Sequence, residues 1–198
     1  MDVAFVSTNE GKFREVASLL APFGVRVRWS PRTLPELQAD RLATVARAKL
    51  AAVPASSRRV LVEDSGLFLE AFPGFPGVYS APVYALLGFG PILRLLRGRT
   101  RAAAFRTVAA LRWDGTVRLF YGEVRGRIAL GPRGAHGFGY DPIFLPEGAA
   151  RTFAEMGPAE KDAISHRGQA IRRAGAWMRR RAGPRARAVA RRSDREQM

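Results

Sequence analysis

Short apolar runs alternate with longer amphipathic segments in the first third of the chain. The runs, which predict buried strands, lie at residues 3–6, 25–29 and 60–62. Between them, residues 13–20 carry apolar side chains at the i, i+3, i+4, i+7 spacing of a helix, and residues 39–53 predict a second helix that stops before Pro54. The pattern therefore predicts strands and helices in alternation.

The pattern changes after Gly66. Two long apolar runs at residues 102–113 and 116–124 flank Asp114-Gly115, which is the strongest short-range signal for a β-hairpin. The remaining segments predict a rigid Pro/Gly-rich loop at 72–77, helix near 84–97, an extension of the sheet at 125–130, a Gly-rich loop with aromatics at 133–146 and a helix at 165–181.

Composition indicates one folding unit without a membrane anchor. The 198 residues are 47% hydrophobic, and no apolar run approaches the roughly 18 residues that a membrane span needs. The start of the chain has no basic region typical of a secretory signal, and the chain has no cysteine. We therefore expect a soluble, cytoplasmic protein without disulfides.

The formal net charge of +16 is concentrated partly at the C-terminus. Residues 178–198 contain eight Arg against Asp194 and Glu196, and Gly183-Pro184 breaks any helix there. We expect residues 181–198 to form a disordered, solvated tail. Nonspecific attraction to nucleic acids is the alternative interpretation, and it makes a basic nucleic-acid-binding module the competing class of function.

Lysine is almost absent from this arginine-rich chain. Against 30 Arg there are three Lys, namely Lys12, Lys49 and Lys161. Because surface charge can be supplied by either cation, positions that keep lysine are candidates for a compact ammonium with a specific task.

Two adjacent carboxylates follow the third apolar run. Glu63 and Asp64 repel each other, so a cation between them and an anionic ligand such as phosphate would keep both ionised. Ligands commonly bind where buried parallel strands end, which is where the pattern places Asp64. With Glu36 as a third acid, the sequence predicts a site for Mg²⁺, with Mn²⁺ as the alternative.

Three other segments carry groups that suit a nucleotide. The turn 7–12 precedes a helix whose free N–H groups, with Lys12, would bind phosphate. The loop 137–142 offers aromatic faces for stacking a base and Asp141 as an acceptor. Lys161 and the segment 165–168 supply clustered donors for keto or phosphate oxygens.

Together and in this order, these segments resemble the inosine triphosphate pyrophosphatase family, and the archaeal members most closely. The matching text is Ser7-Thr8-Asn9-x-x-Lys12, Glu63-Asp64-Ser65-Gly66-Leu67, Pro76-Gly77-Val78-Tyr79-Ser80-Ala81, Gly137-Phe138-Gly139-Tyr140-Asp141-Pro142-Ile143-Phe144 and Lys161-x-x-x-Ser165-His166-Arg167-Gly168-Gln169-Ala170. The resemblance implies an α/β fold: one domain at residues 1–180, with an elongated mixed sheet, flanking helices, two lobes and the active site in the cleft between them. It also implies a homodimer that hydrolyses ITP, dITP and XTP to the monophosphate and pyrophosphate with Mg²⁺, cleansing the nucleotide pool.

The resemblance implies the following roles. Asp64 would be the catalytic proton acceptor and, with Glu36, a metal ligand, and Glu63 is a weaker candidate ligand. Phosphate and nucleoside would be bound by Ser7, Thr8, Asn9, Glu10, Gly11, Lys12, Ser65, Phe138, Gly139, Tyr140, Asp141, Lys161, His166 and Arg167. One departure is the Glu-Asn pair that many bacterial relatives carry and that residues 44–49 lack, which leaves the surroundings of Lys49 undetermined. The nearest competing enzyme is a pyrophosphatase of the related septum-formation-inhibitor-like group, whose motifs differ from these.

Overall fold

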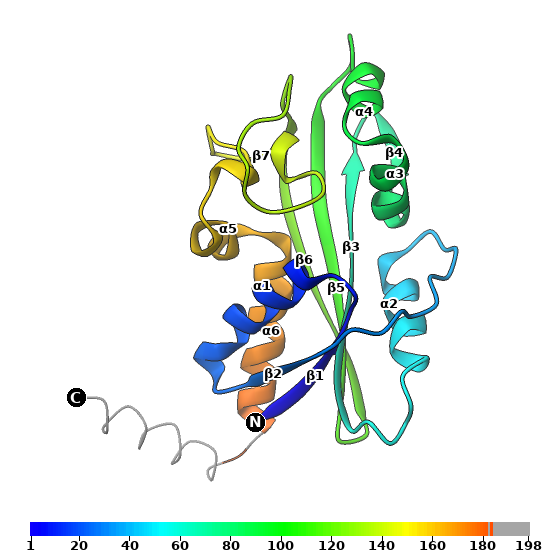
Figure 1. Cartoon of the computed structure of the whole chain (residues 1–198), viewed down its shortest axis with the longest axis vertical. Helices are drawn as coiled ribbons and strands as arrows, with labels where there is room; N and C mark the ends of the chain where they lie inside the picture. Colours follow the sequence, from blue (N-terminus) through cyan, green and yellow to red (C-terminus); the bar gives the residue numbers. More distant parts are fainter. Residues whose placement is uncertain (182, 184–198) are drawn as a thin grey trace, which may run out of the picture.

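The computed structural model describes residues 1–181 and 183, which form a seven-stranded mixed sheet with helices around it (Figure 1). The strand order is β2-β1-β3-β5-β6-β7, with β4 paired to β3. The strands are β1 (Asp2–Val6), β2 (Arg26–Ser30), β3 (Arg59–Leu69), β4 (Phe72–Pro76), β5 (Ala102–Trp113), β6 (Thr116–Ile128) and β7 (Phe144–Pro146). The α-helices are α1 (Glu10–Leu20), α2 (Leu42–Ala51), α3 (Ser80–Leu87), α4 (Gly90–Leu95), α5 (Pro158–Ile164) and α6 (His166–Arg181), and 3₁₀ turns occur at Ala21–Phe23, Gly77–Tyr79, Asp141–Ile143 and Phe153–Glu155. The mixed α/β fold expected from the sequence is confirmed.

Helices cover both faces of the lower half of the sheet in Figure 1. On one face, Leu61 of β3 packs into a core with α1 and α6. On the other face, Val60 and Val62 pack against α2. Because successive side chains of a strand point to opposite faces, a strand buried on both sides reads as a continuous apolar run.

The upper half is built on the long β5–β6 hairpin, which stands near the centre of Figure 1. The hairpin predicted around Asp114-Gly115 is confirmed, and β6 continues as predicted, to Ile128. On one face of this half, Leu67 and Phe105 join a core with α4, β7 and the 3₁₀ turns. The elongated shape follows from these two long strands.

Strand β3 is longer than the sequence analysis indicated. We expected it to end at Val62, but it pairs with β5 from Arg59↔Trp113 to Leu69↔Ala103. Glu63 and Asp64 consequently lie in the middle of a strand rather than at its end. The polar residues and Gly66 look like a break in the apolar pattern, yet the long partner β5 keeps the strand extended by backbone pairing.

Two other segments differ from expectation. The predicted rigid loop at residues 72–77 is mostly strand β4, which pairs with β3 through Phe68↔Pro76 and Leu69↔Phe72. The helical region near 84–97 is two helices, α3 and α4, separated at Gly88, whose φ of 61° is unfavourable for other residues. The C-terminal helix is confirmed as α6.

The arginine-rich tail predicted for residues 181–198 lies outside the described residues, apart from Arg181 and Gly183. Within the part of the chain that the structure describes, no helix is both long and apolar enough to span a membrane.

Candidate active site

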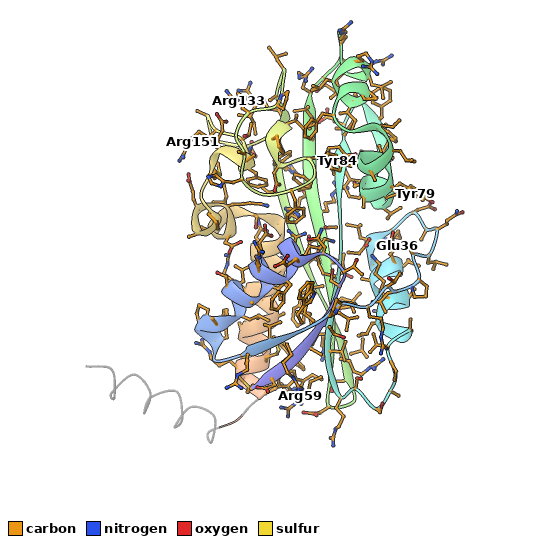
Figure 2. All side chains as sticks on the ribbon, in the orientation of Figure 1. Glu36, Arg59, Tyr79, Tyr84, Arg133 and Arg151 are labelled. Carbon is orange, nitrogen blue, oxygen red and sulfur yellow. The ribbon has the colours of Figure 1, made fainter. Side chains whose placement is uncertain are left out.

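Asp64 and Glu63 point to opposite faces of β3, so each has its own cationic partner. On the α2 face, Lys49 Nζ lies 2.6 Å from Asp64 Oδ1 and 3.0 Å from Glu36 Oε1. Lys49 is in the last turn of α2, whereas Glu36 belongs to the loop that precedes α2 and is largely exposed (Figure 2). The structure thus brings both predicted metal ligands to one lysine.

The second carboxylate oxygen of Asp64 is a candidate ligand for a cation at this place. Asp64 Oδ2 is buried and has no hydrogen-bond partner within residues 1–181 and 183. Burial raises the pKa of Asp64, and Lys49 offsets this effect only in part. Mg²⁺ binds through one or two carboxylates, with water and phosphate oxygens as its other ligands. Asp64 and Glu36 fit that requirement, although among residues 1–181 and 183 no three His, Asp or Glu side chains are gathered as a metal centre.

On the α1/α6 face, the Glu63 carboxylate forms ion pairs with Arg167 and Lys12. Arg167 Nε lies 2.9 Å from Glu63 Oε2 and Nη2 lies 3.2 Å from Oε1, while Lys12 Nζ is 3.6 Å from Oε1. Burial alone would raise the pKa of Glu63, but Arg167 and Lys12 outweigh it and hold the pKa well below its usual range. Because side chains of a strand alternate between its two faces, Glu63 and Asp64 lie on opposite faces of β3 and have separate surroundings.

Glu15 of α1 is a member of this cluster that the sequence analysis missed. Its two oxygens accept from Arg167 Nη1 at 2.6 Å and from Lys161 Nζ at 2.8 Å. Lys161 also donates to Asp141 Oδ2 at 2.6 Å, so the carboxylates and cations alternate. The signal available in the sequence was the spacing: Glu15 follows Lys12 by three residues and shares its helix face.

The predicted phosphate-binding turn lies beside this cluster. Asn9 caps α1 by accepting from the Lys12 N–H at 2.9 Å, and Ser7 Oγ accepts from the Asn9 N–H. Burial lowers the pKa of Lys12, with Glu63 opposing that effect. The side chain of Glu10 turns outward and accepts hydrogen bonds from Arg14. Thr8 is exposed.

The loop around Phe138 closes over the same groups. Lys161 Nζ is 4.8 Å and Arg167 Cζ is 5.4 Å from the centre of the Phe138 ring. A Cβ on Gly11 would lie 2.8 Å from that ring, so only glycine allows the loop to approach α1 this closely. Asp141 accepts from the Phe138 N–H.

Tyr140 and His166 are buried rather than exposed to a ligand. Tyr140 packs edge-on to Tyr84 inside the upper core, and its hydroxyl has no partner among the described residues. His166 stacks on Phe105 at 4.7 Å, and burial lowers its pKa well below the ordinary value, so the ring is neutral at pH 7. In the chain, Tyr140 directly precedes Asp141 and His166 directly precedes Arg167, so both are next to residues of the cluster. Ser65 lies in the cluster itself, because it accepts from Arg167 Nη2.

Comparison with known proteins identifies the family of this chain. A family model described as "Ham1 family" matches residues 3–177. Proteins named dITP/XTP pyrophosphatase are similar: the one from Thermococcus kodakarensis is 50% identical over 181 residues, covering 90% of this chain and 97% of the relative, and the one from Pyrococcus horikoshii is 43% identical over 180 residues, covering 90% and 97%. The solved Ham1 protein of Staphylococcus aureus is 30% identical with a TM-score of 0.76, covering 90% of this chain and 98% of that one. The chain therefore belongs to the Ham1 family.

Proposed function

We propose that this protein hydrolyses non-standard purine nucleoside triphosphates, namely ITP, dITP and XTP, to the monophosphate and pyrophosphate. The observation that carries the proposal is the placement of a base-binding cluster and an acidic pair on the two faces of one strand segment, Glu63-Asp64-Ser65. The names of the relatives support the same reaction. Clearing such nucleotides from the cell's pool would be its role.

In the proposed mechanism, the phosphates bind the N-terminal end of α1, where the capped turn presents N–H groups and Lys12 adds a positive charge. Asp64 Oδ2 accepts a proton from a water molecule as the water oxygen bonds to the α-phosphorus. The bond from the α-phosphorus to the bridging oxygen then breaks, and pyrophosphate leaves. Lys49 holds the Asp64 carboxylate by its other oxygen.

Asp64 and Glu36 would hold Mg²⁺, or Mn²⁺ in its place, near these phosphates. The bound ion would neutralise charge on the triphosphate. We expect EDTA to abolish activity and added Mg²⁺ to restore it.

Base choice follows from the donors around Phe138. Among the described residues, Lys161 Nζ has two acceptors, Glu15 and Asp141, so one of its three N–H groups remains for a ligand. A keto oxygen at the 6-position of hypoxanthine or xanthine accepts from such donors, whereas the 6-amino group of adenine cannot. An unpaired buried donor costs about 1–3 kcal/mol, which is about tenfold or more in rate per contact.

The decisive experiment is hydrolysis of equal concentrations of ITP, XTP, dITP, ATP, GTP and CTP with Mg²⁺, with pyrophosphate and orthophosphate measured separately. We expect pyrophosphate from ITP, dITP and XTP much faster than from ATP or GTP. Orthophosphate as the product, or equal rates for all bases, would contradict the proposal.

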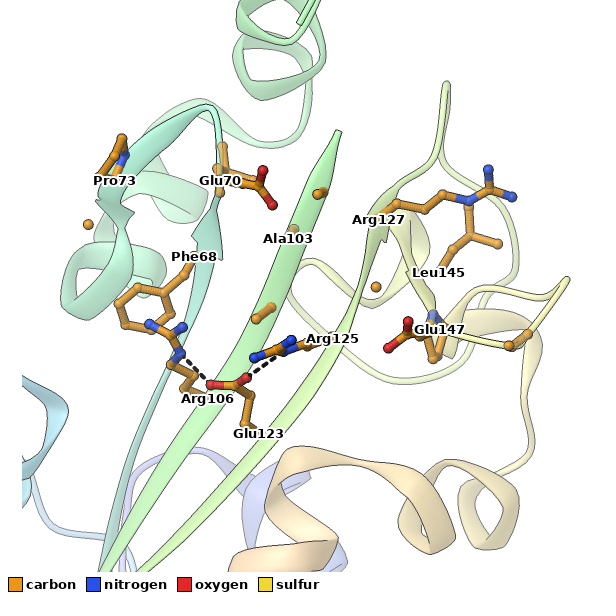
Figure 3. A pocket seen from close by; sticks show the side chains of 18 of the residues that line it. Phe68, Glu70, Pro73, Ala103, Arg106, Glu123, Arg125, Arg127, Leu145 and Glu147 are labelled. Atoms are coloured by element: carbon orange, nitrogen blue, oxygen red, sulfur yellow. Dashed lines mark hydrogen bonds and ion pairs between the residues drawn. The ribbon is translucent and has the colours of Figure 1, made fainter. Parts of the chain in front are cut away.

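We also propose that the protein is a cytoplasmic homodimer. A hollow of about 1100 Å³ lies along the upper part of the sheet, lined by β3, β5, β6 and the segment after β7 (Figure 3). Its lining mixes small and apolar residues with both charges, including the Arg106–Glu123–Arg125 row. A twofold interface requires such a self-complementary face. Light scattering should give twice the chain mass, and Ala104→Arg should reduce it to one chain mass.

A further inference from the structure

Trp29 is a partly exposed residue of an edge strand, and its side chain contacts the proposed phosphate-binding turn. It is near the end of the edge strand β2, opposite Phe5 of β1, and its side chain is 38% exposed. Its indole Nε1 donates to the carbonyl oxygen of Ser7 at 2.8 Å. Its ring stacks on Phe13 of α1, with centroids 5.3 Å apart and planes 11° apart.

These two contacts lie at the two ends of the turn. Ser7 begins the segment that Asn9 closes as the cap of α1, and Phe13 directly follows Lys12. The Ser7 N–H is also held, by the carbonyl of Ser30 at 3.3 Å. With both its N–H and its carbonyl bonded to β2, Ser7 has a fixed peptide orientation, and the N–H groups that follow it are aimed accordingly.

We infer that Trp29 is a positioning residue for the phosphate-binding turn: it fixes the Ser7 carbonyl and the first turn of α1 without touching the nucleotide. The inference rests on the proposed function, because it takes the turn as the site of the substrate's phosphates. A hydrogen bond and an aromatic stack from one rigid side chain limit the motion of the turn before the ligand arrives.

The substitution Trp29→Phe keeps an aromatic face for Phe13 and removes the indole N–H. If the turn binds phosphate equally in the ground and transition states, its loosening raises KM and leaves kcat unchanged. For one lost hydrogen bond we expect KM for ITP to rise about fivefold, with kcat within about twofold. Trp177→Phe, on α6 against Phe120, is the matched control and should change neither constant.

A second measurement does not depend on turnover. Inorganic tripolyphosphate, as a probe for the turn alone, should change the intrinsic fluorescence of the wild type and of Trp177→Phe but not of Trp29→Phe. Its dissociation constant for Trp29→Phe, measured by calorimetry, should also rise about fivefold. Phe13→Leu removes the other contact and should raise the same constants, which keeps the inference testable if Trp29→Phe does not fold.

A purely structural role for Trp29 would lower the melting temperature and the fraction of active enzyme, so kcat would fall with KM unchanged. That result, or an unchanged dissociation constant for tripolyphosphate, would overturn the inference. Tripolyphosphate binding that depends on Trp29 in a protein that does not hydrolyse ITP would support it while rejecting the proposed reaction.

Discussion

Lys49 Nζ lies 2.6 Å from Asp64 Oδ1, and the same ammonium reaches Glu36, so one side chain joins the two acids proposed as metal ligands. The other oxygen of Asp64 is buried and has no hydrogen-bond partner in the part of the chain that the structure describes. The two oxygens of the Asp64 carboxylate therefore have different surroundings and different roles. Lys49 fixes the orientation of the group, and the free oxygen remains available for a proton or a cation.

Replacing Asp64 with Asn should remove activity without harming the fold. The amide keeps the size of the side chain but cannot accept a proton from water, and general-base catalysis is worth about 10²–10⁴-fold in rate. We expect kcat for ITP to fall at least about a hundredfold. Because burial raises the pKa of Asp64, a neutral side chain there should leave the melting temperature equal or higher.

The exposed substitution Asp40→Asn serves as the control for this experiment and should leave kcat unchanged. An Asp64→Asn variant that keeps most of its activity would remove Asp64 from the catalytic role.

Replacing Arg167 with Lys should weaken base selection. The guanidinium contacts Glu63 through two nitrogens and Glu15 through a third, and a lysine ammonium cannot reproduce that planar geometry. Two lost charge-assisted hydrogen bonds predict a fall in kcat/KM for ITP of about 100-fold. The ratio of kcat/KM for ITP over ATP should narrow, because the donors facing the base would no longer be held in place.

Arg172→Lys is the matched control, since Arg172 donates to backbone carbonyls of α5 outside this cluster. If Arg167→Lys lowered ITP and ATP hydrolysis by the same factor, Arg167 would contribute to activity without contributing to base choice.

The start of α6 approaches the sheet very closely at Gly122 of β6. A Cβ on Gly122 of β6 would lie 1.9 Å from the carbonyl oxygen of His166, a distance at which the backbone must shift. We expect Gly122→Ala to reduce the free energy of unfolding by about 1–3 kcal/mol and to lower turnover, because Arg167 moves with the helix. Urea unfolding and ITP hydrolysis measure the two effects.

The comparison variant for this experiment is Gly131→Ala, because a Cβ there would meet nothing within 4 Å. Its free energy of unfolding should change by less than about 0.5 kcal/mol. If the two variants reduced the free energy of unfolding equally, the close approach at Gly122 would not be the cause of the loss.

The sequence predicted the elements with strong periodicity and missed what depends on partners distant along the chain. Helix α6 and the β5–β6 hairpin could be anticipated because their signals are local. The length of β3 depends on pairing with β5 across about 45 residues, which no local pattern shows. For the same reason the separation of Glu63 from Asp64 was not foreseen: it follows once both residues are known to lie inside a strand.

The residues of the candidate site could likewise be predicted only in part from the sequence. The motifs indicated Lys161 and Arg167, but not that Glu15 would lie between them, since the acid comes from a helix more than 140 residues away. The rarity of lysine in this chain indicates Lys49 as a candidate, yet its contacts with Glu36 and Asp64 depend on the packing of α2 on β3. Residue type in the sequence indicates which side chains are candidates for the site, and the fold determines which of them contact one another.

Asp162 should make the stability of the protein depend on pH in an identifiable window. Burial, and then Glu15, raise its pKa to about 6, and its Oδ1 has no partner among the described residues. The folded state therefore binds a proton more readily than the unfolded state. The stabilisation is fully present below the ordinary pKa of about 4 and is lost as the pH rises through 6.

Asp162→Asn removes the ionisation and should stabilise the protein at pH 8 relative to the wild type, by about 1 kcal/mol after allowance for solvent screening. Near pH 4 the gain should vanish, because the wild-type carboxyl is then neutral too. Urea unfolding at both pH values measures the difference, with the exposed substitution Asp40→Asn as the control. A gain that is the same at both pH values would mean that packing, and not ionisation, distinguishes Asn from Asp at this position.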